Sequence, residues 1–247
     1  MSQDASEAKR SRGIYLLPNL FTTAGLFAGF YAVVAAMKGF FDLAAFSIFV
    51  AMVADGLDGR VARLTNTESD FGAQYDSISD MLAFGVAPAM VVYSWGLIHL
   101  GKLGWLAAFV YTATGALRLA RFNTQIGGSD NRFFTGLPIP AAAGFIASFV
   151  WVSNLHGIDG FVIDGIVAVL TVIIGLLMVS NLSYYSFKDL DFKGKVPFVM
   201  ILAAVLLLVI VSIDPPTVLF AGFTVYALSG LFVSAYCWWY KRGAKKE

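Results

Sequence analysis

Apolar residues occur in long runs along the whole chain, separated by short polar segments. Each run is about 20 residues long, which is the length that a helix needs to cross the hydrocarbon core of a bilayer. The pattern therefore predicts an all-α, polytopic bundle of about eight transmembrane helices. Because the connections are short, we expect one integral-membrane domain over residues 1–247. The predicted spans are residues 15–37, 41–63, 75–98, 103–122, 138–155, 161–180, 196–213 and 217–240.

The composition agrees with a membrane protein. Of the 247 residues, 58% are hydrophobic and 13% are charged, whereas a soluble domain carries about 25% charged residues. The mean hydropathy is +0.75. The single cysteine, Cys237, cannot form an internal disulfide, so the fold needs no oxidising compartment. The formal net charge of +1 says little about partners. We expect membrane lipids and no nucleic acid among them.

Basic residues gather on one side of the predicted bundle. If the N-terminus is cytoplasmic, all of the 17 Lys and Arg residues except Lys38 and Lys102 lie on the cytoplasmic side. This is the positive-inside pattern, and an even number of spans places both termini in the cytoplasm. Residues 1–14 and 241–247 would then be cytoplasmic tails. We expect a protein of the plasma or inner membrane of a prokaryote.

Four aspartates stand at the cytoplasmic ends of the second and third predicted spans. On a helix, residues three and four positions apart share a face. The spacing therefore places the aspartates, together with small residues, on two helical stripes. These stripes are Asp55, Asp58, Gly59 and Ala62 on the second span, and Gly72, Asp76 and Asp80 on the third.

A turn at residues 65–69 would fold the two stripes together and bring four carboxylates into one small volume. Such carboxylates repel one another unless a cation lies between them. Carboxylate oxygens suit Mg²⁺, Mn²⁺ or Ca²⁺, and the lack of nearby Cys or His argues against zinc. Because Mg²⁺ commonly shares its ligand shell with phosphates, the site suggests a phosphate-bearing substrate. Arg63 supplies a guanidinium for phosphate oxygens.

Two other interpretations stay open at this point. The acids could be ordinary charges at helix ends, with the glycines and alanine as packing residues. The cluster could also be the ion site of a cation transporter. A transporter site usually lies near the bilayer midplane in repeated halves, whereas this chain has no clear repeat and places Arg63 beside the acids.

The stretch "DGLDGRVARLTNTESDFGAQYDSISD", residues 55–80, reads D-x-x-D-G-x-x-A-R-x8-G-x-x-x-D-x-x-x-D. It resembles the signature of the CDP-alcohol phosphatidyltransferase family at every fixed position. The resemblance implies a two-metal enzyme in a helical membrane bundle, with its active site facing the cytoplasm. Family members transfer a phosphatidyl group from CDP-diacylglycerol to an alcohol and release CMP. The resemblance also implies a homodimer.

The resemblance assigns roles to the motif residues. Asp80 would complete the metal site and take the proton of the acceptor hydroxyl. The segment "PNLFTTAG" at 18–25 resembles a first-span motif of the family and adds Asn19 and Thr22 as candidate nucleotide contacts, with interhelical hydrogen bonding as the alternative. The metal ligands would be Asp55, Asp58, Asp76 and Asp80, and the CDP-diacylglycerol site would include Gly59, Ala62, Arg63 and Gly72.

The acceptor alcohol is suggested by later segments. "GALRLARFN" at 115–123, "RFFTGLPIPAAAG" at 132–144 and "VSNLSYYSFKDL" at 179–190 resemble the branch of the family that uses L-serine. Arg118 and Arg121 share a helix face, so one could clamp the serine carboxylate, with Asn123 nearby. Glycerol 3-phosphate or an inositol compound as acceptor stays open, and so does binding of the two arginines to anionic lipid.

Overall fold

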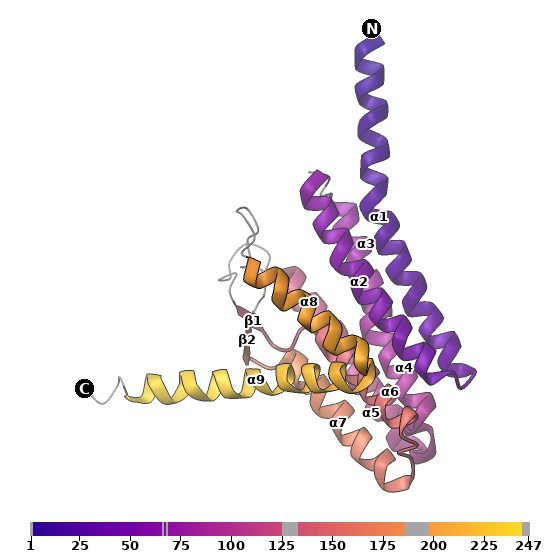
Figure 1. The fold of residues 1–247 in the computed structure, drawn as a ribbon, viewed down its shortest axis with the longest axis vertical. Helices are drawn as coiled ribbons and strands as arrows, with labels where there is room; N and C mark the ends of the chain where they lie inside the picture. Colours follow the sequence, from indigo (N-terminus) through magenta and orange to yellow (C-terminus); the bar gives the residue numbers. More distant parts are fainter. Residues whose placement is uncertain (1, 66, 68, 125–132, 186–197, 244–247) are drawn as a thin grey trace.

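The chain folds into a bundle of long helices, described here from a computed structural model (Figure 1). The structure describes residues 2–65, 67, 69–124, 133–185 and 198–243. In chain order the elements are α1 (Ser2–Met37), α2 (Phe41–Thr65), α3 (Asp70–Asp80), the π-helix η1 (Met81–Val86), α4 (Ala87–Trp95), the 3₁₀-helix η2 (Leu97–Leu100), α5 (Lys102–Thr124), β1 (Phe133–Thr135), α6 (Ile139–Leu155), α7 (Phe161–Val179), β2 (Ser183–Tyr185), α8 (Phe198–Ile213) and α9 (Pro215–Gly243).

A helix lies at each predicted span, which confirms the all-helical class. Residues 196 and 197 of the seventh span and 244–247 of the C-terminal tail lie outside the described residues. Within the part of the chain that the structure describes, five helical segments are long and apolar enough to cross a membrane, so the count of eight spans stays a prediction. Helix α6 is shorter, at 17 residues, and α8 has 16. The five segments are Leu17–Met37, Asp70–Trp95, Lys102–Thr124, Phe161–Val179 and Pro215–Phe232.

The bundle contains one small element that the sequence pattern did not predict. Strands β1 and β2 pair antiparallel, with Phe134 opposite Tyr184. The chain leaves this pair through Gly136, whose φ is +80°, a conformation that glycine adopts without strain. A side chain at this position would collide with the Met178 carbonyl. The two strands therefore tie the α5–α6 connection to the end of α7.

Helices α1 and α2 run alongside each other (Figure 1). Both helices bury several alanines, and small side chains let helix backbones approach closely inside a membrane. Helix α1 also packs on α3, η1 and α4. The buried alanines include Ala28, Ala32, Ala35 and Ala36 of α1 and Ala44, Ala45 and Ala51 of α2.

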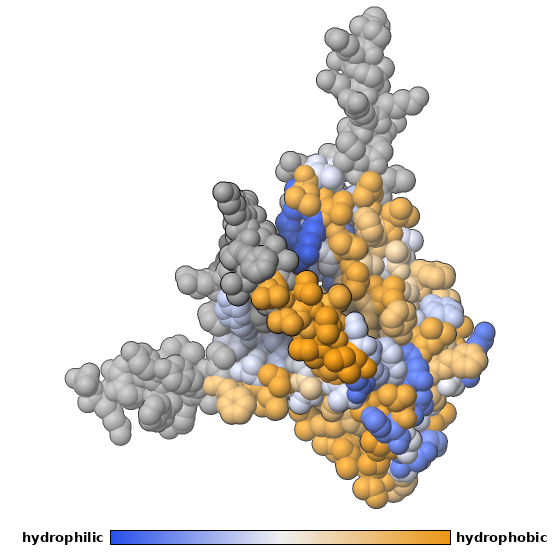
Figure 2. Space-filling view, viewed as in Figure 1, coloured by the Kyte–Doolittle hydropathy of each residue, from blue (hydrophilic) through white to orange (hydrophobic). Residues whose placement is uncertain are grey.

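The remaining helices complete the bundle on the other side of α4. Helix α5 packs on α7, and α6 packs on α2 and α9. Figure 2 shows hydrophobic side chains over most of the visible helical surface, with hydrophilic ones gathered near the upper ends of α2 and α3 and around the turns at the opposite end. This distribution is the one expected for helices surrounded by lipid.

Candidate active site

The turn between α2 and α3 folds the two acidic stripes toward each other. Helix α2 ends at Thr65 and α3 begins at Asp70. Ser69 is the N-cap of α3, and its Oγ accepts a hydrogen bond from the Gly72 N–H at 3.1 Å. A serine in this position satisfies a backbone donor that the helix itself leaves free. The predicted hairpin is therefore confirmed, and a short cap fixes where α3 starts.

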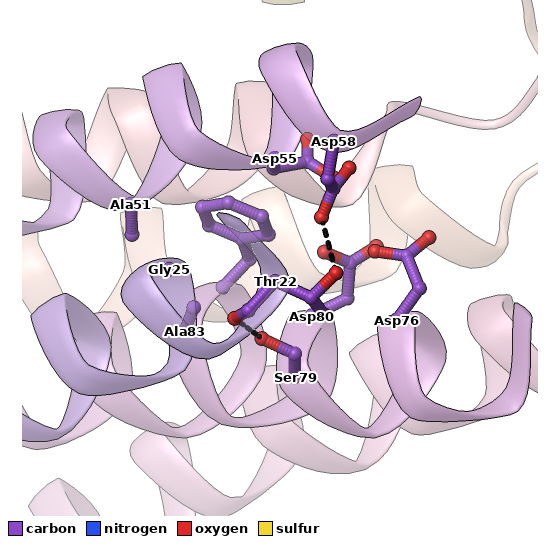
Figure 3. A pocket seen from close by; sticks show the side chains of 10 residues that line it. Thr22, Gly25, Ala51, Asp55, Asp58, Asp76, Ser79, Asp80 and Ala83 are labelled. Carbon is purple, nitrogen blue, oxygen red and sulfur yellow. Dashed lines mark hydrogen bonds between the residues drawn. The ribbon is translucent and has the colours of Figure 1, made fainter. Parts of the chain in front are cut away.

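Three of the four aspartates converge on one point. Asp55, Asp76 and Asp80 each present a carboxylate oxygen, and these oxygens lie within 4.8 Å of one another (Figure 3). All three side chains are half-buried between α2 and α3. A set of hard oxygen donors at this separation fits Mg²⁺, Mn²⁺ or Ca²⁺. The described residues thus include an acidic cluster that is able to hold a divalent metal.

The fourth aspartate is held by α1. Asp58 is only 5% exposed, and its Oδ2 lies 2.7 Å from the Thr22 hydroxyl. The same hydroxyl lies 3.2 Å from the Pro18 carbonyl. Because a hydroxyl has one proton, the shorter contact to a carboxylate is the stronger bond. Thr22, expected from the first-span motif, therefore contacts a motif aspartate directly.

A narrow cleft opens between α1, α2 and α3 (Figure 3). Its empty volume is about 170 Å³, counting the part that is open to solvent. No enclosed space the size of a water molecule remains between the described side chains that line it. An ion or a phosphate group would therefore meet the carboxylates from the open side, and a nucleoside or a lipid would have to lie outside the cleft. The lining residues are Thr22, Gly25, Ala51, Asp55, Asp58, Asp76, Ser79, Asp80, Ala83 and Phe84.

The small and basic motif residues lie on the parts of α2 and α3 between the acids and the turn. Gly59 and Arg63 are exposed, and a Cβ placed on Gly59 would lie 4.0 Å from Arg63 Nη2. A Cβ on Gly72 would lie 3.6 Å from Asn19 Oδ1. Asn19 of α1 therefore faces α3 at the motif glycine. Ala62 is half-buried on the same stripe as Gly59.

The three predicted acceptor residues have different environments. Arg118 is only 8% exposed, and no described residue offers a hydrogen-bond acceptor to its Nε. It lies close enough to Asp80 for an electrostatic interaction. The other two residues are bonded within the protein: Arg121 Nη2 donates to Asn181 Oδ1 at 2.9 Å, and Asn123 Nδ2 donates to Ser77 Oγ at 3.1 Å.

Five of the residues that line the cleft were missed from the sequence, and Ser79 and Gly25 are the two that connect helices most directly. The Ser79 hydroxyl donates to the Thr22 carbonyl at 3.1 Å and so ties α3 to α1. Its position beside the Asp76 and Asp80 stripe gave no separate signal. Gly25 allows close packing, since a Cβ there would lie 3.6 Å from both the Ala51 carbonyl oxygen and the Ala54 Cβ. It is the last residue of the first-span motif, so the motif itself contained that signal.

Fold and site together define a helical membrane protein with an acidic cluster that is able to hold a divalent cation, and with an exposed arginine near it. A family model of CDP-alcohol phosphatidyltransferase matches residues 15–180, about two thirds of the chain. The matched range contains every motif residue discussed above, together with Arg118. The protein belongs to the CDP-alcohol phosphatidyltransferase family.

Curated relatives extend the similarity. The chain is 36% identical over 216 residues to a CDP-diacylglycerol–serine O-phosphatidyltransferase of Helicobacter pylori, covering 87% of this chain and 90% of the relative. It is 38% identical over 184 residues to an enzyme of the same name from Methanocaldococcus jannaschii, covering 74% and 80%. It is 34% identical over 178 residues to an archaetidylserine synthase of Methanothermobacter thermautotrophicus, covering 71% and 72%.

The bond between Thr22 and Asp58 leads to a first prediction. Thr22→Val keeps the shape of the side chain but leaves a buried carboxylate without its hydroxyl donor, which costs about 1–3 kcal/mol. We expect a lower thermal unfolding midpoint in detergent micelles and weaker Mn²⁺ binding in titration calorimetry. The control is Thr23→Val, since Thr23 is exposed and its hydroxyl contacts the Asn19 carbonyl and the Tyr75 hydroxyl rather than a carboxylate. Equal effects of the two substitutions would contradict the role of Thr22.

Proposed function

We propose that this protein transfers the phosphatidyl group of CDP-diacylglycerol to the hydroxyl of L-serine, giving phosphatidylserine and CMP. The observation that carries the proposal is the convergence of Asp55, Asp76 and Asp80 within 4.8 Å, in a family whose members transfer phosphatidyl groups. The names of the three relatives agree on serine as the acceptor or on a serine lipid as the product.

Asp80 is the proposed general base. It lies in the cluster on the side that interacts with Arg118, so an acceptor held by Arg118 would present its hydroxyl near the Asp80 carboxylate. Asp80 takes the hydroxyl proton, and the serine oxygen forms a bond to the phosphorus that bears diacylglycerol. The bond from that phosphorus to the bridging oxygen breaks, and CMP leaves with the electron pair. We favour direct attack, because no other nucleophile is evident at the site.

The four aspartates are the proposed metal ligands. Mg²⁺ or Mn²⁺, with two ions expected and Ca²⁺ also compatible, would neutralise the pyrophosphate and the charge that develops during in-line attack. The hydrogen bond from Thr22 fixes one carboxylate of the set, so the chain itself provides part of the rigidity that such a site needs. The proposed ligands are Asp55, Asp58, Asp76 and Asp80.

The CDP moiety is proposed to lie along the stripes between the acids and the turn. The cleft is too small for a nucleoside, whereas Gly59 next to it is exposed and leaves the backbone of α2 accessible. Arg63 is exposed there and would meet phosphate oxygens. The proposed contacts are Gly59, Ala62, Arg63 and Gly72, with Asn19 and Thr22 from α1.

Serine is favoured over a phosphorylated acceptor by the state of the arginines. A phosphate group would be best met by two free guanidinium groups. Arg121 already donates to Asn181, whereas the Nε of Arg118 has no partner among the described residues. The single buried guanidinium of Arg118 suits the carboxylate of serine. Asn123, bonded to Ser77, would then orient α5 against α3 beside the acceptor.

The membrane arrangement belongs to the same proposal. Eight spans would place both termini and the acidic cluster on the cytoplasmic side, where CDP-diacylglycerol and serine meet. Arg63 and Arg121 lie at this end of the bundle, as the positive-inside pattern expects. We propose a homodimer in the plasma or inner membrane of a prokaryote, with membrane lipids around it.

The acceptor assignment is tested with purified protein, CDP-diacylglycerol and Mn²⁺ or Mg²⁺, following CMP release with a panel of acceptors. We expect release with L-serine, and little with glycerol 3-phosphate or inositol compounds. Asp80→Asn is the internal control and should lose at least about a hundredfold in kcat, because the base is removed. Release with glycerol 3-phosphate but not with serine would contradict the acceptor. Near-full activity of Asp80→Asn would contradict the assigned base.

The role of Arg118 is tested by Arg118→Lys, which keeps the positive charge and loses the Nε donor. Loss of a hydrogen bond to a charged group costs about 1.5–3 kcal/mol. We therefore expect the KM for serine to rise about tenfold to a hundredfold, with the KM for CDP-diacylglycerol unchanged. Arg121→Lys is the comparison and should raise the KM for serine much less, because Arg121 is bonded to Asn181. A larger effect of Arg121→Lys would reverse the assignment.

A further inference from the structure

The helical geometry changes directly after the proposed base. Helix α3 ends at Asp80, and the next six residues, Met81–Val86, form the π-helix η1 before α4 begins. π-helical turns are rare and commonly mark functional positions. Here the π-helical turn joins the acidic stripe of α3 to α4, which packs on α1 and α5.

One carbonyl of η1 is bonded by a side chain from α5. Pro88 has no N–H, so the carbonyl four residues earlier, that of Phe84, lacks its usual helical donor. The Tyr111 hydroxyl donates to this carbonyl at 3.1 Å. Tyr111 is completely buried, so its hydroxyl replaces the missing backbone donor where no water is available.

The neighbouring carbonyl has a similar contact. Thr112 Oγ1 lies 3.3 Å from the Gly85 carbonyl and 3.0 Å from the Ala108 carbonyl of its own helix. A Cβ placed on Gly115 would lie 3.7 Å from the Gly85 Cα, so α5 approaches the backbone of η1 closely. Two consecutive α5 side chains therefore reach the backbone of the π-helical turn.

The opposite side of η1 is held by α1. A Cβ placed on Gly29 would lie 2.6 Å from the Ala83 Cα, so the two backbones are in contact there. This contact limits the position of η1 but reaches none of its carbonyls. Ala83 and Phe84 also line the cleft that contains the Asp80 carboxylate. A change in the geometry of η1 is therefore transmitted to the position of Asp80.

We propose that Tyr111 is a positioning residue for Asp80: its hydroxyl holds the π-helical turn that sets Asp80 within the acidic cluster. This inference rests on the proposed phosphatidyl transfer, in which Asp80 is the base. Without the hydroxyl, the Phe84 carbonyl loses its donor and the turn relaxes. Relaxation changes the rotation of α3 relative to α4, and the Asp80 carboxylate moves away from Asp55 and Asp76.

The test compares Tyr111→Phe with Tyr184→Phe. Both tyrosines are completely buried, and each donates to a backbone carbonyl at 3.1 Å, that of Phe84 for Tyr111 and that of Ala227 for Tyr184. The measurements are kcat and KM for CMP release, the Kd for Mn²⁺ by titration calorimetry, and the thermal unfolding midpoint. The two variants should lose similar stability, which leaves catalysis and metal binding to separate them.

We expect Tyr111→Phe to lower kcat about tenfold to a hundredfold, as small misplacements of reacting groups do. The KM for serine should change less than about twofold, and the Kd for Mn²⁺ should rise severalfold. Tyr184→Phe should keep kcat and the Kd for Mn²⁺ close to the wild-type values. An unchanged kcat and Kd in Tyr111→Phe, or equal losses in both variants, would overturn the inference.

Thr112 gives a second comparison, which tests the inference in case the Tyr111→Phe variant does not fold. Thr112→Val removes the hydroxyl near the Gly85 carbonyl and should lower kcat and Mn²⁺ affinity, whereas Thr112→Ser should retain both. Equal behaviour of these two variants would overturn the inference. Wild-type protein that releases no CMP with any acceptor would contradict the proposed function itself. An active wild type with an equally active Tyr111→Phe variant would contradict only the positioning role.

Discussion

The main physical constraint on this structure is the mutual repulsion of carboxylates that the helices hold close together in an apolar bundle. Asp55, Asp76 and Asp80 have oxygens within 4.8 Å of one another. At an effective dielectric constant of about 20, each ionised pair at this separation repels by about 3.5 kcal/mol, so three pairs give about 10 kcal/mol. A folded domain is stable by only about 5–15 kcal/mol in total. A cation between the ionised carboxylates would remove this repulsion, and the surrounding helices have to hold the acids close together against it.

The helices meet this requirement through a local cap and through hydrogen bonds between elements near the acids. The Ser69 cap fixes the start of α3, and Thr22 of α1 holds the buried carboxylate of Asp58. Ser79 ties α3 back to α1, and Tyr111 of α5 holds the turn that follows Asp80. These bonds involve short side chains or a fully buried ring, so little conformational freedom is left to the groups that position the carboxylates. A preorganised charge site of this kind is what stabilises a phosphoryl-transfer transition state.

The sequence predicted those features that depend on spacing along one helix. Offsets of three and four fix which residues share a face, so the two acidic stripes and their hairpin were predictable. Features that depend on partners far away in the chain were not. Arg118 and Arg121 lie three residues apart on one helix face. Arg121 nevertheless donates to Asn181, which lies 60 residues further along the chain, whereas the Nε of Arg118 has no partner among the described residues. Strands of three residues have too little periodicity to be detected, and η1 lies inside an apolar run in which Pro88 was the single local signal.

The most direct test of the central claim is an experimental structure of the protein with Mn²⁺ and CDP-diacylglycerol, using anomalous scattering of manganese to locate the ions. We expect anomalous peaks within coordination distance of the Asp55, Asp76 and Asp80 carboxylates, with the pyrophosphate bound to the same ions and the cytidine lying toward Gly59 and Gly72. Manganese bound elsewhere, or a pyrophosphate bound away from the acidic cluster, would contradict the proposed metal site.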